Sequence, residues 1–244
     1  MVSDSQPVAI GAIGGSGTRV VAGLLAELGY FIGHELNQSN DNLSFTRRFK
    51  RLEILDLPAD EFRRLSGEFV AEMEAGRREA GAERWGWKEP NTQVVIDRLL
   101  EVLPGLKYIH VIRNGLDMAH STNQNQPRLW GRHFLGGDSR TVISPRYALK
   151  FWCAVQRRIV RLASELGEAR IHLLNYDDLC RSPVPVIERL AVFLEAGTSE
   201  AARIRLAERV APPASLGRWR AAGLSVFDSA DVDYVASLGF DVAE

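Results

Sequence analysis

The chain has 244 residues, of which 45% are hydrophobic and 25% are charged, so its composition is that of an ordinary globular protein. Its formal net charge of −1 provides no bulk positive charge with which to hold nucleic acid or an anionic membrane surface. No stretch approaches the roughly 18 uninterrupted apolar residues that a membrane-spanning helix needs.

The first predicted elements are a strand over residues 8–13, a Gly-rich turn, and a helix over residues 18–28 that stops at Gly29. Glycines let backbone N–H groups close on an anion, and the start of the helix adds its positive end. This segment therefore predicts a bound phosphate or sulfate group. The alternative is a strand-to-helix turn that uses glycine only for its geometry.

Two common nucleotide-binding patterns are excluded at this turn. The pattern GxxxxGK[ST] requires a lysine directly before the hydroxyl residue, but Gly17 precedes Thr18. The pattern GxGxxG begins at Gly15 and Gly17 but then meets Val20 in place of the last glycine.

Further along the chain, strand-like runs alternate with helical patterns. Strands are predicted at residues 85–88, 107–112 and 170–174, and helices at residues 60–78, 92–103, 114–123, 146–166 and 184–194. The polar segments 33–44 and 124–142 are predicted to be loops, and the tail after Gly197 a charged helix, a break at Pro212 and Pro213, and a polar end. Without a linker or repeat, this alternation predicts a single α/β domain over residues 1–244, with a central parallel sheet and helices on both faces.

A second anion site is predicted where the strand over residues 107–112 ends at Arg113. Ligands of open α/β sheets collect at the carboxyl ends of the strands. Ser121 follows Arg113 after about two helical turns. A guanidinium and a hydroxyl placed in this way can clasp one phosphate. The alternative is a surface arginine and an exposed helical serine.

Together these motifs resemble the sulfotransferases that use 3′-phosphoadenosine-5′-phosphosulfate (PAPS). Their first loop reads roughly [KR]-x-G-[TS] after a strand, where this chain has Gly15-Ser16-Gly17-Thr18. Their second motif, R-[ND]-[PAG]-x-D-x-x-x-S, is matched at every specified position by residues 113–121. The resemblance implies a three-layer α/β/α fold like that of P-loop nucleotide triphosphatases, and transfer of a sulfuryl group from PAPS.

Three shorter segments resemble the family in the family's order. Residues 87–90 resemble the Lys-containing strand end, residues 175–179 the Y-[ED]-D-L segment, and residues 215–220 the late G-x-W-[KR] segment that closes over the nucleotide. The resemblance therefore spans about residues 8–220.

The resemblance also implies which residues bind the donor. Those expected at the 5′-phosphosulfate are Gly15, Ser16, Gly17 and Thr18, through backbone and hydroxyl groups. Arg19, in the first helical turn, either adds a positive charge there or points to solvent. Arg113 and Ser121 are expected at the 3′-phosphate, with Arg218 as a further candidate from the C-terminal segment.

The chain departs from the family at one position, because many members carry a lysine where Gly15 stands. That lysine stabilises charge on the bridging oxygen as the sulfuryl group leaves. Lys88, at a predicted strand end, is expected to replace it. The alternative is a lysine simply exposed at a loop.

The acceptor also needs a group that takes up its proton. Glu35 is favoured, because some family branches carry a catalytic glutamate a few residues after the first helix. His34 and Glu89 are the other candidates, since histidine is a residue type that commonly acts as a general base. The family's histidine variant is excluded, because Pro90 occupies that position.

The remaining histidines and aromatic residues have structural alternatives. His110 is predicted to pack in the core and His120 to be structural. The residues that could line an acceptor pocket are Trp85, Trp87, Trp130, Phe134 and Trp152, the last of which fits a core position better. Residues 31–49 and 124–142 are expected to shape the choice of acceptor.

The expected function is therefore transfer of a sulfuryl group from PAPS to a hydroxyl or amine of a small-molecule or carbohydrate acceptor, without a metal. One alternative is a P-loop kinase of a small molecule, against which the missing lysine before Thr18 counts. Another is a non-catalytic nucleotide-binding interaction protein. Cys153 and Cys180 fit neither a disulfide framework nor a metal cluster, and no signal peptide is visible, so a cytoplasmic protein is expected.

Overall fold

The computed structural model describes residues 6–243 and is built on a five-stranded sheet with the order β2-β3-β1-β4-β5. The strands are β1 (Val8–Ala12), β2 (Tyr30–Phe31), β3 (Arg84–Lys88), β4 (Lys107–Ile112) and β5 (Ile171–Asn175). Every neighbouring pair is parallel, so all the carboxyl ends meet at one edge of the sheet. The predicted α/β class is confirmed.

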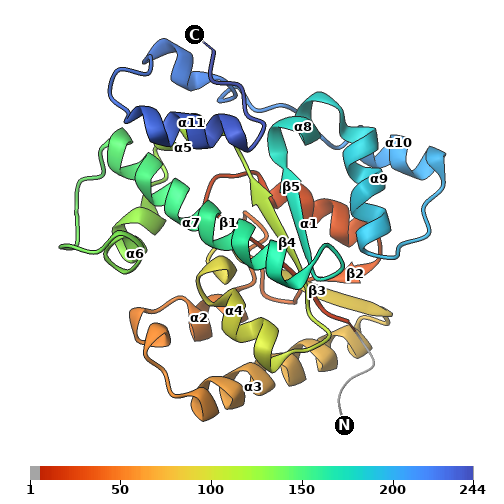
Figure 1. The fold of residues 1–244 in the computed structure, drawn as a ribbon. Helices are drawn as coiled ribbons and strands as arrows, with labels where there is room; N and C mark the ends of the chain where they lie inside the picture. The colour runs from red at the N-terminus through yellow and green to blue at the C-terminus, as the bar shows by residue number, and fades with distance from the viewer. Residues whose placement is uncertain (1–5, 244) are drawn as a thin grey trace.

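Helices cover both faces of the sheet (Figure 1). One core cluster joins alternate residues of β1 and β4 to α1 (Thr18–Glu27), α8 (Tyr176–Arg181) and α9 (Pro183–Phe193). The other joins the opposite faces of these strands to α3 (Ala59–Glu79), α4 (Thr92–Val102) and α7 (Pro145–Leu166). The remaining helices are α2 (Leu43–Phe49), α5 (Gly115–Ala119), α6 (Asn125–Leu135), α10 (Glu200–Ala207) and α11 (Ser229–Ser237), with 3-10 helices at Leu52–Leu55 and Arg218–Ala221. The side chains of β1 and β4 thus pack alternately into two core layers, as the three-layer expectation requires.

Helix α2 begins inside the segment predicted as a polar loop. Asn42 caps it, because its side-chain oxygen accepts a hydrogen bond from the N–H of Phe45 at 2.8 Å. Phe45 stacks on Phe49 at 4.5 Å and on Trp87 at 5.6 Å. Aromatic packing from a distant strand therefore stabilises a helix that local composition does not predict.

Helix α5 is shorter than the predicted helix over residues 114–123. It ends at Ala119, and the Gln124 amide then donates hydrogen bonds to the carbonyls of Met118 and Ser121 at 3.0 and 2.8 Å. The Met118 carbonyl also accepts from the N–H of Ser121 at 3.1 Å, so a tight backbone turn and a side chain together satisfy the end of this helix before Ser121. A separate helix, α6, then occupies the segment predicted as a long loop, and α11 occupies the tail.

Most of the aromatic residues considered for an acceptor pocket lie in the core instead. Trp85, Trp87 and Trp130 are buried, and the Trp130 indole donates to Asn91 at 2.7 Å. The expectation that these three line a pocket is therefore wrong. Phe134 is partly buried against the same core, and the core position expected for Trp152 is confirmed.

His110 packs in the core as predicted, within a buried polar chain. Its Nδ1 lies 2.7 Å from Tyr108 Oη and its Nε2 lies 3.0 Å from Gln156 Oε1. Burial lowers the pKa of His110 to about 3, so the imidazole is neutral at pH 7.

This pKa predicts how stability depends on pH. Below its ordinary pKa of 6.5, His110 takes up a proton in the unfolded chain but not in the folded one, so its contribution is complete above pH 6.5 and is lost as pH falls toward 3. We expect His110→Gln to reduce the slope of unfolding free energy against pH by up to about 1.4 kcal/mol per pH unit between pH 6 and 4. Urea titrations across this range measure the slope, with His133→Gln, an exposed residue of α6, as control. An unchanged slope in His110→Gln would contradict the prediction.

Candidate functional site

The turn after β1 is an open, glycine-shaped cradle at the start of α1. Gly15 and Gly17 have φ values of 98° and 89°, in the left-handed region that favours glycine. Gly17 is the N-cap residue of α1, so no side chain of its own satisfies the first N–H groups of the helix. Ser16 and Thr18 are buried, whereas Gly15 is exposed. This arrangement leaves backbone donors available to an anion.

Tyr176, the first residue of α8, holds the shape of this turn. A side chain on Gly17 would overlap the Tyr176 ring, so glycine is required by packing as well as by φ. Burial raises the pKa of Tyr176 to about 12, which keeps its hydroxyl protonated at neutral pH. The residue belongs to the segment 175–179, whose sequence gave no hint of this contact.

Arg113 directly follows β4 and lies beside the turn. Its side chain is buried, and its Nη1 donates to the carbonyl of Gly15 at 3.3 Å. Its Nη2 donates to the carbonyl and hydroxyl of Ser215 at 2.7 and 2.9 Å. Its Nε is buried and has no hydrogen-bond partner among residues 6–243. One donor of this guanidinium is thus left for a ligand.

Ser121 lies just beyond the end of α5, close to the turn after β1. A Cβ placed on Gly15 would be 3.8 Å from Ser121 Oγ, so the two residues are neighbours in space. The hydroxyl accepts a hydrogen bond from the N–H of Asn123 at 3.2 Å and can still donate one. The structure therefore brings together the first turn, Arg113 and Ser121.

Arg218 approaches the same region from the C-terminal segment. It donates to the carbonyls of Ser215 at 3.2 Å and His120 at 3.4 Å. Burial, and secondarily the charge of Arg113, lower the pKa of Arg218. The guanidinium groups of Arg113 and Arg218 are therefore close enough to donate to the same carbonyl, that of Ser215. Arg19, by contrast, is exposed in the first turn of α1.

Asp117 is a residue of this region to which the sequence reasoning gave no role. It occupies the aspartate position of the second motif, and its buried carboxylate lies 3.6 Å from Arg113 Nη2. It also accepts hydrogen bonds from the N–H groups of Gly217 at 2.8 Å and Trp219 at 3.3 Å. The motif itself was the available signal.

Lys88 ends β3, the strand next to β1 in the sheet. Its side chain is 1% exposed, and its Nζ donates to the carbonyl of Ser39 at 2.5 Å and forms an ion pair with Asp41. Burial lowers the pKa of Lys88, while the contact with Asp41 opposes this. The alternative of a lysine simply exposed at a loop does not hold.

The turn that covers Lys88 is itself well ordered by hydrogen bonds. Asn37 Oδ1 accepts from the N–H groups of Ser39 at 2.8 Å and Asp41 at 2.9 Å, and Asn37 Nδ2 donates to Asp41 Oδ2 at 2.9 Å. Asp41 is thereby oriented toward the Lys88 ammonium. We refer to residues 37–41 as the Asn37 turn.

The three candidate proton acceptors occupy different surroundings. Glu89 is buried, accepts from the N–H and the amide of Asn91 at 2.5 and 2.9 Å, and has a pKa raised by burial. Glu35 is exposed and pairs with Arg47 at 2.5 Å. His34 is exposed and lies 3.5 Å from Glu79. Glu35 and His34 are neighbours in sequence, but their side chains pair with different residues.

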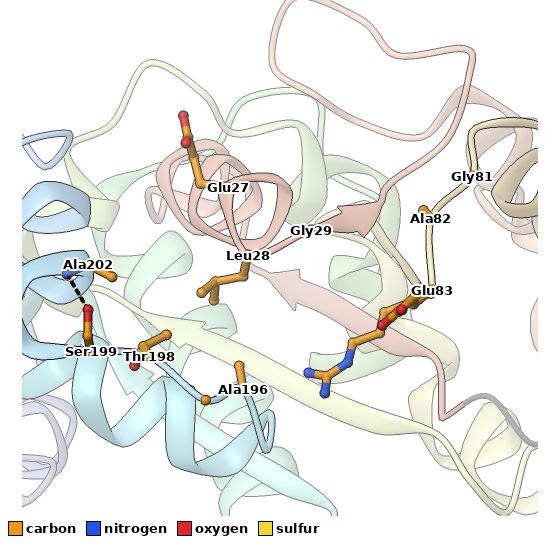
Figure 2. A pocket seen from close by; sticks show the side chains of 12 residues that line it. Glu27, Leu28, Gly29, Gly81, Ala82, Glu83, Ala196, Thr198, Ser199 and Ala202 are labelled. Atoms are coloured by element: carbon orange, nitrogen blue, oxygen red, sulfur yellow. Dashed lines mark hydrogen bonds between the residues drawn. The ribbon is translucent and has the colours of Figure 1, made fainter.

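A second hollow lies away from these residues, toward the amino ends of the strands. Its volume is about 770 Å³, and Figure 2 shows it between the end of α1 and the start of α10, where Ser199 caps Ala202. Arg84, which lines it, already donates to the carbonyls of Leu194 and Glu195, both at 3.2 Å. None of the residues that line this hollow belongs to the site at the carboxyl ends of the strands.

Among residues 6–243, which the structure describes, no helix is both long and apolar enough to cross a membrane. Nor do those residues include a group of three or more His, Cys, Asp or Glu side chains arranged to hold a metal ion.

Comparison with known proteins gives a consistent result. A family model described as "Sulfotransferase family" matches residues 7–200. The sulfotransferase domain of the olefin synthase of Synechococcus PCC 7002 is 18% identical, with a TM-score of 0.62 over 100% of this chain and 99% of that one. Sulfotransferase STF9 from Mycobacterium avium is 14% identical, with a TM-score of 0.55 over 92% and 77%. The sulfotransferase domain from the curacin biosynthetic pathway is 21% identical, with a TM-score of 0.53 over 80% and 75%.

At these identities the solved structures show a shared fold. None of the curated proteins matches the chain in sequence.

The turn after β1 generates a stability prediction. We expect Gly17→Ala to lower the free energy of unfolding by about 2 kcal/mol or more, because alanine is strained at this φ and its methyl group overlaps Tyr176. Gly23→Ala, within α1 where an added Cβ meets nothing within 4 Å, is the matched control and should stabilise by about 0.5–1 kcal/mol. Urea unfolding measures both; equal effects of the two variants would contradict the packing argument.

Proposed function

This chain belongs to the sulfotransferase family, and we propose that it transfers a sulfuryl group from PAPS to a hydroxyl or amine of a small-molecule or carbohydrate acceptor. One observation carries the choice of donor: the two anion-binding elements are contiguous, with Arg113 Nη1 3.3 Å from the Gly15 carbonyl. PAPS carries a 5′-phosphosulfate and a separate 3′-phosphate, so it needs two such elements side by side.

In this proposal the residues divide between the two anionic ends of the donor. The backbone and hydroxyl groups of residues 15–18 hold the 5′-phosphosulfate, and Arg19 adds a cation at the rim. Arg113, Ser121 and Arg218 hold the 3′-phosphate. The buried Arg113 Nε without a partner among residues 6–243 supports this assignment, because a phosphate oxygen would satisfy it.

PAPS, when bound, supplies the sulfuryl group, and the protein's task is to stabilise charge and to accept a proton. We assign the first task to Lys88, because its ammonium lies at the carboxyl edge of the sheet, one strand from the phosphosulfate cradle. A buried cation stabilises developing negative charge more strongly than an exposed one. To serve in this way, Lys88 exchanges at least one of its contacts with the Asn37 turn for a donor oxygen.

For the second task we propose Glu35, with His34 as the alternative. Glu35 is exposed and can be reached by an acceptor hydroxyl, whereas Glu89 is enclosed by Asn91 and shielded from solvent. A general base must come within hydrogen-bond reach of the proton that it removes.

The cytoplasmic location remains part of the proposal. Cys153 and Cys180 are both buried free thiols, which suits a reducing compartment. Burial raises the pKa of Cys153 to about 12, so this thiol is unreactive at neutral pH.

Calorimetric titration with adenosine 3′,5′-bisphosphate tests the donor. We expect the protein to bind it, and Arg113→Ala to weaken binding by about tenfold or more, because a charge-assisted contact to phosphate is lost. Arg161→Ala, an exposed arginine of α7 paired with Glu165, is the control and should bind as the unmodified protein does. Absence of binding, or binding indifferent to Arg113, would reject PAPS as the donor.

Release of adenosine 3′,5′-bisphosphate from PAPS, measured with a panel of phenolic, alkyl and carbohydrate hydroxyls, tests the role of Lys88. We expect Lys88→Met to slow release by about 100-fold or more while nucleotide affinity changes by less than about threefold. Lys88→Arg keeps the charge, so its rate is expected to fall between those of Lys88→Met and the unmodified protein. Lys150→Met, at a half-exposed lysine of α7 that pairs with Asp228, is the control.

Full turnover by Lys88→Met would remove Lys88 from catalysis. Nucleotide binding by the unmodified protein without turnover of any acceptor would instead favour the non-catalytic alternative.

A further inference from the structure

The turn formed by residues 215–219 carries Arg218, one group of the proposed 3′-phosphate site, and Ser215, a hydrogen-bond partner of another. Ser215 accepts from Arg113, and Arg218 follows three residues later. Gly217 between them has a φ of 75°, and a Cβ there would lie 2.8 Å from Arg220 Nη1. We call this segment the 215–219 turn.

Within this turn, the start of the 3-10 helix Arg218–Ala221 has no cap from its own sequence. Gly217 is the N-cap residue and has no side chain with which to accept from the first N–H groups. Asp117, 100 positions earlier in the chain, accepts from the N–H of Gly217 at 2.8 Å and also from that of Trp219 at 3.3 Å. The cap of this helix is thus supplied by α5.

The same carboxylate also acts electrostatically on both guanidinium groups of the site. It lies 3.6 Å from Arg113 Nη2, and its charge also acts on Arg218. Arg113 and Arg218 repel each other, and both are wholly or partly withdrawn from water. The buried carboxylate beside Arg113 offsets that repulsion before any nucleotide arrives.

We propose that Asp117 is a positioning residue that assembles the 3′-phosphate half of the donor site by holding the 215–219 turn against Arg113. This inference rests on the proposed function, because it concerns how that donor site is built. Asp117 itself accepts hydrogen bonds only and does not contact the phosphate. Trp219 is buried and anchors the turn to the core, while Asp117 fixes how the turn faces Arg113.

Loss of Asp117 is expected to weaken nucleotide binding, whereas its electrostatic effect alone would predict tighter binding. A carboxylate near a phosphate site repels the phosphate, so removing only its charge would tighten binding. If Asp117 positions the turn, removing it loosens the turn and weakens binding. The loss is specific to ligands with a 3′-phosphate, because the cradle at residues 15–18 is left intact.

Equilibrium binding of two nucleotides tests this. Adenosine 3′,5′-bisphosphate engages both halves of the proposed site, and adenosine 5′-monophosphate engages the first half only. We expect Asp117→Asn and Asp117→Ala to weaken binding of the bisphosphate by about tenfold or more and to change that of the monophosphate by less than about twofold. Asp177→Asn is the matched control, because Asp177 is also buried near Arg113 but bonds to the N–H of Asn114 and not to the 215–219 turn.

Hydrogen exchange of the same variants provides a second readout. In Asp117→Asn we expect faster exchange of the amides of Gly217 and Trp219, with unchanged protection in β1 and α4. This measurement stands even if Asp117→Ala fails to fold.

Tighter bisphosphate binding in Asp117→Asn, equal losses for both nucleotides, or unchanged exchange in the 215–219 turn would each overturn the proposal. If the unmodified protein binds no bisphosphate at all, the proposed function fails, and exchange in the turn still decides the positioning role.

Discussion

One buried guanidinium connects the parts of this molecule that bear on its function. Arg113 is fixed in direction by the end of β4 and reaches the turn after β1 through Gly15 and the C-terminal segment through Ser215. Burying such a charge is unfavourable unless its donors are satisfied and its charge is balanced. Two carbonyls, a hydroxyl and Asp117 meet most of this requirement, and one nitrogen is left over. The need to stabilise this charge therefore draws three distant segments to one place.

The part of the site that follows from parallel-sheet geometry was predictable from sequence. Strand ends at residues 12, 88 and 112 are recognisable from their apolar runs, and in a parallel sheet they meet at one edge. The two expected anion-binding motifs could therefore be placed at the same edge of the sheet without a structure, whereas the adjacency of β1 and β4 comes from the structure. The family resemblance identified the expected ligand of the two motifs as PAPS, with its 5′-phosphosulfate and its 3′-phosphate. The family match supports that resemblance.

Contacts between side chains far apart in the sequence could not be predicted. Nothing in residues 87–90 indicates that Ser39 and Asp41 enclose Lys88, and nothing in residues 215–219 indicates that Asp117 caps their turn. Helix boundaries were missed for a similar reason. Helix α2 depends on the stacking of Phe45 against Trp87, and α5 ends where Gln124 takes up its last carbonyls. In each case tertiary packing outweighs local propensity.

The glycine at position 15 has a consequence for the coupling between ligand and fold. Apart from the exposed Arg19, the first turn contains no cation, so the positive charge around it comes from residues 88, 113 and 218, each on a different segment. A peptide of residues 8–28 would carry the glycines of the motif but almost none of its charge. In the proposed function, anion affinity therefore depends on the assembled sheet, and an anion bound there would shift the folding equilibrium toward the native state. The occupied protein would therefore be more stable against unfolding than the free one.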